Sequence, residues 1–322
     1  MLRGTYGHES VLDVLSTLYT ETLRDERRDL ARSAAKSEEA GSASGSGRAA
    51  ARRLRWRQPA TFQLVYGEFD PDFFARLIEA AKLTEAGKEI FVDLGSGAGR
   101  LVLSAALLKP ALWKRCIGLE VLSELHLQAL AAAELLPDLL AVHSSHNAPS
   151  SSSSKLAAPC RFHCVDLFDP HGEAPHFLCT ATCCMAYAIT WAADDMGRLT
   201  TLSDLLGATL PDGARVLTVD LQLMDTPRLC FQLMAMERGW NAETGDTTGY
   251  VYRAHIVRKP VVTQADVDEN DAASTIQLIS HVYPVVRTVK RKGMSDRHAS
   301  VDIKLELSVW WRQAWRRKRR QT

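Results

Sequence analysis

The chain has 322 residues, enough for one large domain or two small ones, and its hydrophobic fraction of 46% is ordinary for a globular protein. No uninterrupted apolar run reaches the roughly eighteen residues of a membrane span, so we expect none. The N-terminus lacks the apolar core of a secretory signal, and seven cysteines favour reduced thiols in an intracellular protein. The formal net charge of +1 hides a strongly basic C-terminal segment.

The N-terminal region has three parts. Apolar residues recur at helical spacing on a charged background between positions 9 and 36, which predicts a helix. Residues 37–47 are rich in Ser, Gly and Ala and predict a flexible linker. A basic cluster, residues 52–57, then leads into the main core. We therefore expect a helix and linker over 1–51 and a folded core over 52–262.

The segment from Ile90 to Arg100 is the most informative of the chain. Its β-branched apolar start predicts a buried strand that carries Asp93 into a glycine-rich turn, and a helical pattern follows. A dinucleotide-binding turn has the spacing Gly-x-Gly-x-x-Gly beneath a pyrophosphate. Here the third glycine comes one residue early and an aspartate precedes the first. This pattern favours a ligand with an ammonium and a carboxylate, the amino-acid end of S-adenosyl-L-methionine, with Asp93 facing its amino group.

Two later strands also end in acids. Residues 116–120 close on Glu120, about twenty residues past the glycine turn, where a carboxylate can accept hydrogen bonds from both ribose hydroxyls. Residues 160–167 carry Asp166, placed to accept a bond from the adenine amino group. Alternatively, Glu120 and Asp166 only cap the helices that follow. The three acidic strand ends together predict a class I methyltransferase core.

The rest of the core alternates strand and helix. The expected segments are an insertion loop at 143–159, an apolar run at 177–188, a helix at 194–206, and strands at 214–219, 229–236, 250–257 and 301–310. This order predicts an α/β fold with a Rossmann-like seven-stranded sheet, mostly parallel with an antiparallel strand, and helices on both faces. Cys160, His163 and Cys164 are conceivable zinc ligands, but no Cys-x-x-Cys pair supports them, and we expect no metal.

The C-terminal segment is basic. From Val285 onward, twelve Lys or Arg stand against three Asp or Glu, and the chain ends in tryptophans beside the consecutive cations Arg316–Arg320. Such a segment is typical of a nuclear address or of a nucleic-acid contact made by charge and stacking. The alternative is a solvated tail without a partner. We expect residues 263–322 to form an extension that ends in this tail.

A family resemblance rests on three motifs. Residues 65–68 read Val-Tyr-Gly-Glu and enter a helical segment, residues 91–99 hold the glycine turn, and residues 118–120 read Gly-Leu-Glu. With these motifs the chain resembles the disruptor-of-telomeric-silencing family, the non-SET histone-lysine methyltransferases that modify a lysine of the nucleosome core. The resemblance covers about 56–258 and includes the late aromatic strand 250–256.

The resemblance implies the site residues. The methionine part of the cofactor would lie under a lid that includes Tyr66 and Glu68, and Glu68 would orient the amine or close the lid. The implied cofactor-binding residues are Val65, Tyr66, Gly67, Glu68, Asp93, Gly95, Gly97, Glu120, Asp166 and Leu167. The predicted catalytic residues are Tyr66, Glu68, Trp191 and Tyr252, and the three aromatic ones would wall a channel for the target lysine.

Two departures from the family pattern stand out. Arg100 replaces a glutamine that touches the cofactor, and residues 187–191 replace a paired-asparagine and aromatic motif at the end of the fourth strand. Trp191 keeps an aromatic side chain there, but an amide near the sulfonium is missing.

The sequence predicts a nuclear enzyme, or otherwise a cytoplasmic one, that takes a methyl group from S-adenosyl-L-methionine to a histone lysine. Its partner would be the nucleosome, gripped through the basic segments, with no membrane contact. The alternatives are a lysine of a non-histone protein, or a cofactor-binding scaffold without catalysis. The chosen lysine, the degree of methylation and the oligomeric state do not follow from the sequence.

Overall fold

The computed structural model describes residues 8–20, 24–33, 67–147, 157–169, 171–189, 191, 193–241 and 245–257. The chain divides into two compact units, Met1–Arg258 and Lys259–Thr322, and all of the described residues lie in the first. The predicted linker at 37–47, the basic cluster at 52–57, the strand at 301–310 and the basic tail lie outside the described residues.

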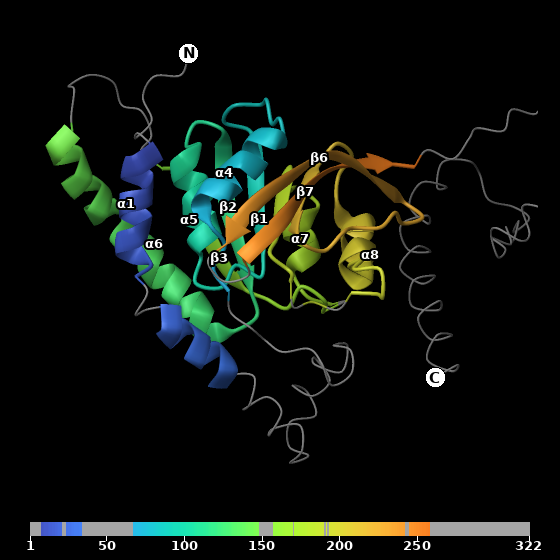
Figure 1. Cartoon of the computed structure of the whole chain (residues 1–322), viewed down its shortest axis with the longest axis horizontal. Helices are drawn as coiled ribbons and strands as arrows, with labels where there is room; N and C mark the ends of the chain where they lie inside the picture. The colour runs from blue at the N-terminus through green and yellow to red at the C-terminus, as the bar shows by residue number, and fades with distance from the viewer. Residues whose placement is uncertain are drawn as a thin grey trace, which may run out of the picture. The chain divides into compact units, whose positions relative to one another are not determined.

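A seven-stranded sheet forms the centre of the first unit (Figure 1). Its strands are β1 (Glu89–Leu94), β2 (Trp113–Glu120), β3 (Cys160–Cys164), β4 (Cys183–Ala186), β5 (Arg215–Val219), β6 (Leu229–Asn241) and β7 (Gly245–Ile256). The strand order is β3-β2-β1-β4-β5-β7-β6, and β7 runs antiparallel to both of its neighbours. The predicted sheet, mostly parallel with an antiparallel strand, is therefore confirmed.

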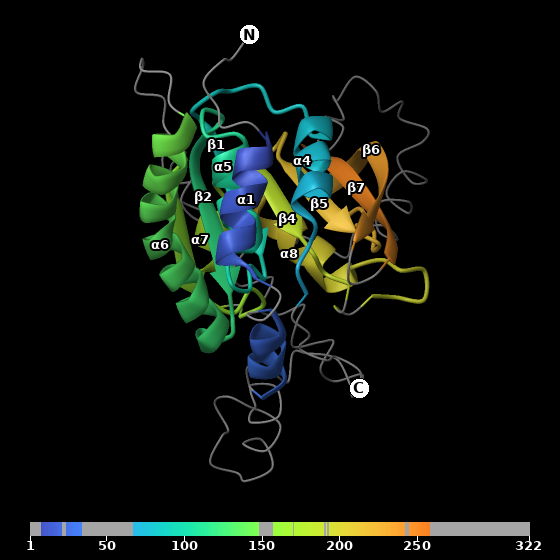
Figure 2. The same cartoon turned by 60° about the vertical axis from the view of Figure 1, so that its left-hand side comes forward.

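Helices cover both faces of the sheet (Figure 2). Their bounds are α1 (His8–Leu18), α4 (Pro71–Ala80), α5 (Arg100–Leu108), α6 (Ser123–Asn147), α7 (Ala174–Leu178) and α8 (Thr200–Thr209), with a further helical stretch at 24–33. The helices α4 and α5 pack on one face, and α7 and α8 on the other. The N-terminal α1 packs against α5 and α6, so the N-terminal region shares a core with the sheet-bearing unit.

Local chemistry explains where these elements begin. Every residue of β1 is buried, as its β-branched apolar sequence predicts. Asp70 caps α4 by accepting a hydrogen bond from the backbone N–H of Phe73 at 2.7 Å, and Pro71 occupies the first helical position. The helix expected from position 194 starts only at Thr200. The side chain of Asp194 accepts bonds from the N–H groups of Met196 and Arg198, which holds a turn in front of α8.

The helix α6 continues to Asn147, where a loop from position 143 was predicted. Its stretch Ser123–His143 is long and apolar enough to cross a membrane by length and composition, which is weak evidence of a span. One face packs on α1 through Leu125, Leu136 and Leu140.

The zinc alternative is wrong for the described residues, among which no group of three potential ligands comes together. Successive side chains of a strand point to opposite faces, so His163 points away from Cys160 and Cys164 on β3. All seven cysteines are free thiols, and Cys164 and Cys179 are exposed.

Candidate functional site

The acidic residues singled out from the sequence meet at one edge of the sheet. Asp93 is the penultimate residue of β1, Glu120 is the last residue of β2, and Asp166 follows β3 by two residues. These strands are parallel neighbours, so their carboxyl ends lie side by side. In open α/β sheets this edge is where ligands bind.

The turn from β1 to α5 depends on its glycines. Gly95, Gly97 and Gly99 all have positive φ, at 80°, 54° and 84°. A Cβ atom at position 95 would lie 3.2 Å from a ring carbon of Trp191, whereas one at position 99 would overlap the ring of Phe162 at 2.6 Å. Gly95 therefore lies beneath the aromatic residue predicted for the site, and Gly99 serves packing.

Asp93 is the most unusual ionisable group of this edge. Its side chain is buried. Burial, and secondarily the neighbouring carboxylate of Glu120, raises the pKa of Asp93 to about 8. A buried carboxyl group beside a second one favours a cationic ligand.

The carboxylate of Glu120 connects the glycine turn to the residues before α6. It accepts hydrogen bonds from the N–H groups of Gly97, Val121 and Leu122, each at 2.8 Å. These bonds orient the side chain at the start of α6 and fix the glycine turn against β2. The alternative that Glu120 serves the following helix thus describes part of its role, and its contact with a ribose stays a prediction.

The segment after β3 contributes a polar and an aromatic group. Asp166 accepts a bond from the N–H of Phe168 at 2.9 Å, and Leu167 is buried in the core. Phe168 meets the ring of Trp191 edge-on, with centroids 5.6 Å apart. Asp166 and Trp191 are thus brought to the edge that bears the glycine turn, and Phe168 is an aromatic neighbour that the sequence did not indicate.

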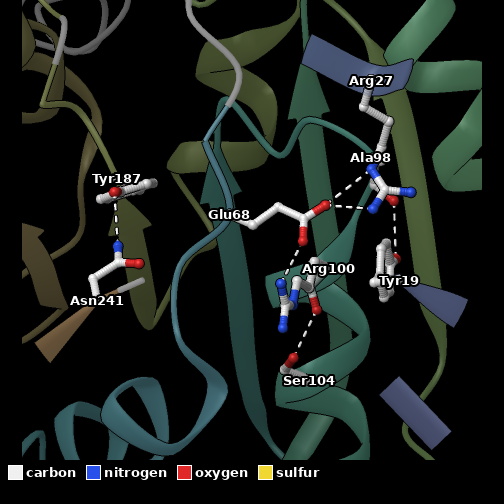
Figure 3. A network of polar contacts seen from close by, with 8 residues as sticks. All are labelled: Tyr19, Arg27, Glu68, Ala98, Arg100, Ser104, Tyr187 and Asn241. Atoms are coloured by element: carbon white, nitrogen blue, oxygen red, sulfur yellow. Dashed lines mark hydrogen bonds and ion pairs between the residues drawn. The ribbon is translucent and has the colours of Figure 1, made fainter. Parts of the chain in front are cut away.

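Glu68 lies in an ion-pair network with Arg27 and Arg100 (Figure 3). One carboxylate oxygen accepts bonds from Arg27, with the Nε atom at 2.9 Å, and the other pairs with Arg100. Arg100, which stands where the family has a glutamine, therefore pairs with Glu68. Gly67 is half-buried beside it, whereas Val65 and Tyr66 lie outside the described residues.

The residue after β4 contacts an amide side chain. The hydroxyl of Tyr187 accepts a hydrogen bond from the side-chain amide of Asn241 at 2.8 Å (Figure 3). Asn241 is buried and ends β6, so an amide reaches the end of β4 from a different strand. Neither partner was singled out as a site residue from the sequence, because the two are 54 positions apart.

The two tyrosines of β7 differ in position. Tyr252 pairs in register with Val216 inside the sheet and is only 4% exposed. Burial raises its pKa to about 12. Tyr250 stacks on Tyr252 with centroids 6.3 Å apart and is half-buried, one pleat nearer the edge. Tyr252 is thus core in this structure, and Tyr250 is the aromatic residue closer to the predicted channel.

The residues present fit a zwitterionic ligand. The Asp93 carboxylate suits an ammonium group, and the buried Ser96 Oγ has no hydrogen-bond partner among the described residues. Gly95 leaves the backbone accessible to a ligand. The observed strand order, with an acid and a glycine turn at the end of β1, defines a class I methyltransferase. Such proteins take their methyl group from S-adenosyl-L-methionine, which confirms the predicted cofactor.

Residues 48–149 match the family described as "Histone methylation protein DOT1". The chain therefore carries a DOT1-family segment within a class I methyltransferase fold, as the loop and glycine motifs indicate. No curated protein matches the chain.

Two solved structures are similar at low identity. The rRNA methyltransferase aviRa from Streptomyces viridochromogenes is 17% identical, over 58% of this chain and 86% of that chain, with a TM-score of 0.41. A SAM-dependent methyltransferase from Thiobacillus denitrificans, in complex with S-adenosyl-L-homocysteine, is 20% identical, over 48% of this chain and 50% of that chain, with a TM-score of 0.30. At these scores neither adds to the strand order as evidence of the fold.

Proposed function

We propose that this protein transfers a methyl group from S-adenosyl-L-methionine to a lysine side chain of a nucleosomal histone, in the nucleus. The observation that carries the proposal is the buried Asp93 beside Glu120, at a glycine turn inside the segment that matches the histone methylation family. The family match supports the histone substrate, and the charge at the turn supports the cofactor.

The cofactor-binding residues act by position and charge. Asp93 would hold the amino group, Gly95 and Gly97 would allow close backbone approach, Glu120 would hold the ribose, and Asp166 with Leu167 the adenine. When bound, S-adenosyl-L-methionine supplies a methyl group already activated on a sulfonium. The protein therefore needs to hold an uncharged amine in line with that methyl, about 3 Å away.

The acceptor residues would keep the lysine amine uncharged. Aromatic walls desolvate the amine and depress its pKa, and they also bind a methylammonium product. Trp191 supports this role because it lies over Gly95, and Tyr66 and Tyr252 stay as predicted candidates. Since both carboxylate oxygens of Glu68 pair with arginines, we propose that Glu68 closes the lid rather than orients the amine.

The described residues carry more acidic than basic side chains, whereas the segments that would bind DNA are basic. Of the 38 Asp and Glu of the chain, 27 lie in the described residues, against 17 of its 39 Lys and Arg. An acidic surface does not attract phosphates, so nucleosome binding would depend on the clusters at 52–57 and 312–320.

The test is transfer of labelled methyl from S-adenosyl-L-methionine to nucleosomes, free histones and a whole lysate in parallel. We expect nucleosomes to be labelled fastest, with a rate that falls steeply between low and physiological salt. Deletion of residues 312–322 should reduce labelling of nucleosomes and leave labelling of free histones unchanged. A nucleosomal rate that does not depend on salt would contradict the DNA contact.

A second candidate is a lysine of a non-histone protein. The Tyr187–Asn241 pair at the end of β4, where the family has paired asparagines, favours it because this end would face the acceptor. Labelling of a lysate protein as fast as nucleosomes would support this candidate. Tight cofactor binding without labelling of any protein would instead indicate a scaffold.

A further inference from the structure

The N-terminal helical residues reach the cofactor turn. Tyr19 directly follows α1, is buried, and donates a hydrogen bond from its hydroxyl to the backbone carbonyl of Ala98 at 2.9 Å. Ala98 lies between Gly97 and Gly99, so this bond connects Tyr19 to the glycine turn (Figure 3). Burial raises the pKa of Tyr19 far above its ordinary value, and the hydroxyl stays a donor at neutral pH.

The second attachment is the ion pair between Arg27 and Glu68. Arg27 belongs to the helical stretch 24–33, and its side chain is 4% exposed against 2% for Glu68. A charge pair desolvated to this degree holds its two side chains in one geometry. The residues next to Glu68 precede α4, so Arg27 connects the N-terminal stretch to the predicted lid.

Glu68 joins two arginines. The guanidinium groups of Arg27 and Arg100 both pair with its carboxylate, and both lie over the ring of Tyr19 at 5.2 and 5.9 Å. The Nε atom of Arg100 is buried and has no hydrogen-bond partner among the described residues. Arg100 also begins α5, where the helix dipole adds positive potential.

Polar side chains therefore lie at both ends of the glycine turn. Asp93 lies at its start, and Arg100, joined to Arg27 through Glu68, lies at its end. The amino-acid end of the cofactor carries an ammonium and a carboxylate, which suit an aspartate and an arginine. Without Arg27, Glu68 would lose one of the arginines that hold it.

We propose that Arg27 and Tyr19 are positioning residues for the amino-acid end of the cofactor, and that the N-terminal stretch thereby sets cofactor affinity. This inference rests on the proposed function, since it assumes that the turn binds S-adenosyl-L-methionine. Arg27 holds Glu68, and through it Arg100 at the end of the turn, while Tyr19 holds Ala98. Because such coupling is reciprocal, bound cofactor also strengthens the docking of the N-terminal stretch.

Two ligands separate this role from a general structural one. S-adenosyl-L-homocysteine contains the amino-acid end, whereas 5′-methylthioadenosine keeps the nucleoside and lacks that end. We expect Arg27→Met to weaken S-adenosyl-L-homocysteine about tenfold by calorimetry and to leave 5′-methylthioadenosine within about twofold. Arg27→Lys should recover part of the loss. Arg32→Met is the matched control, because Arg32 lies on the same stretch and pairs with Asp29 on the surface.

The outcomes are distinct. An equal loss for both ligands would mean that Arg27 only supports the fold, and no loss for either would remove it from the site. If Arg27→Met does not fold, Tyr19→Phe removes only the bond to Ala98 and should weaken S-adenosyl-L-homocysteine about threefold, again selectively. An unselective or absent effect of Tyr19→Phe would overturn the proposal. A wild-type protein that binds neither ligand would contradict the proposed function itself.

Discussion

The two halves of the site are built in different ways. The cofactor half, which comprises Asp93–Arg100, Glu120 and Asp166, comes from the ends of three neighbouring parallel strands. The proposed acceptor half comprises Tyr187, Trp191, Asn241 and Tyr250, which come from the residues after β4 and from the β6–β7 hairpin. The first half is held by backbone geometry and buried charge, and the second by side chains that meet across the fold. Sequence signatures are therefore clear in the cofactor half and weak in the acceptor half.

The largest expected effect separates the halves directly. Asp93→Ala should weaken cofactor binding by about a hundredfold or more and abolish methyl transfer, because it removes the partner of a buried ammonium. The ligand-free protein should gain stability at pH 8, because the substitution removes a buried carboxyl group whose ionisation is costly in the folded state. Calorimetry and thermal unfolding check both signs.

The matched control for this substitution is Asp204→Ala on α8, where the aspartate is exposed. It should change neither cofactor binding nor stability by much. Unfolding of Asp93→Ala at the temperature of the assay would contradict the assignment of Asp93 to the ligand.

The second prediction uses pH to sharpen the role of Asp93. With its pKa raised to about 8, the folded ligand-free protein keeps a proton that the unfolded chain loses near its ordinary value of 3.8. The free energy of unfolding should therefore fall as pH rises between these values. A cationic ligand needs the carboxylate, so affinity for S-adenosyl-L-homocysteine should rise about tenfold per pH unit below 8.

Calorimetry at pH 7 in two buffers of different ionisation enthalpy measures this linkage. We expect release of close to one proton per ligand bound, and no release for Asp93→Asn. Proton uptake by the wild type would show that Asp93 is not the group that titrates.

The third prediction concerns the two tyrosines of β7, Tyr250 and Tyr252. Tyr250→Ala should lower methyl transfer about tenfold with little change in stability, because Tyr250 is half-buried near the edge. Tyr252→Phe should instead cost stability, about 1 kcal/mol, because it removes a buried polar hydroxyl from the core. Single-turnover rates and chemical denaturation distinguish the two. A loss of rate for Tyr252→Phe without a loss of stability would instead indicate that Tyr252 lines the channel.

The smallest expected effect is the coupling between Tyr187 and Asn241. Tyr187→Phe removes the hydroxyl that accepts a bond from the buried amide of Asn241, and we expect a coupling energy of about 1 kcal/mol in a double-mutant cycle with Asn241→Ala. Stability measured by denaturation gives this coupling. If the pair also acts in the acceptor half, the methyl-transfer rate of the two single variants should fall by the same few-fold factor. Independent effects of the two substitutions would separate them.

Much of the cofactor half could be predicted because its signals are local. A β-branched run predicts β1, positive φ selects the glycines, and an acid at a strand end lies at the ligand-binding edge of any parallel sheet. Tyr19 lies in the segment whose spacing predicts a helix, and its side chain is buried. Its bond to Ala98 did not follow, because the partner lies 79 positions away.

The sequence by itself determined the strand and glycine turn of β1, the alternating α/β order and the class of cofactor, since each depends on residues close together in the chain. The tertiary structure decided which side chains meet at the site. It placed Arg27 and Arg100 on Glu68, brought the amide of Asn241 to Tyr187, and buried Tyr252 while leaving Tyr250 near the edge. The reason is physical: ion pairs and hydrogen bonds depend on distance in space, and only packing sets that distance for residues far apart in sequence.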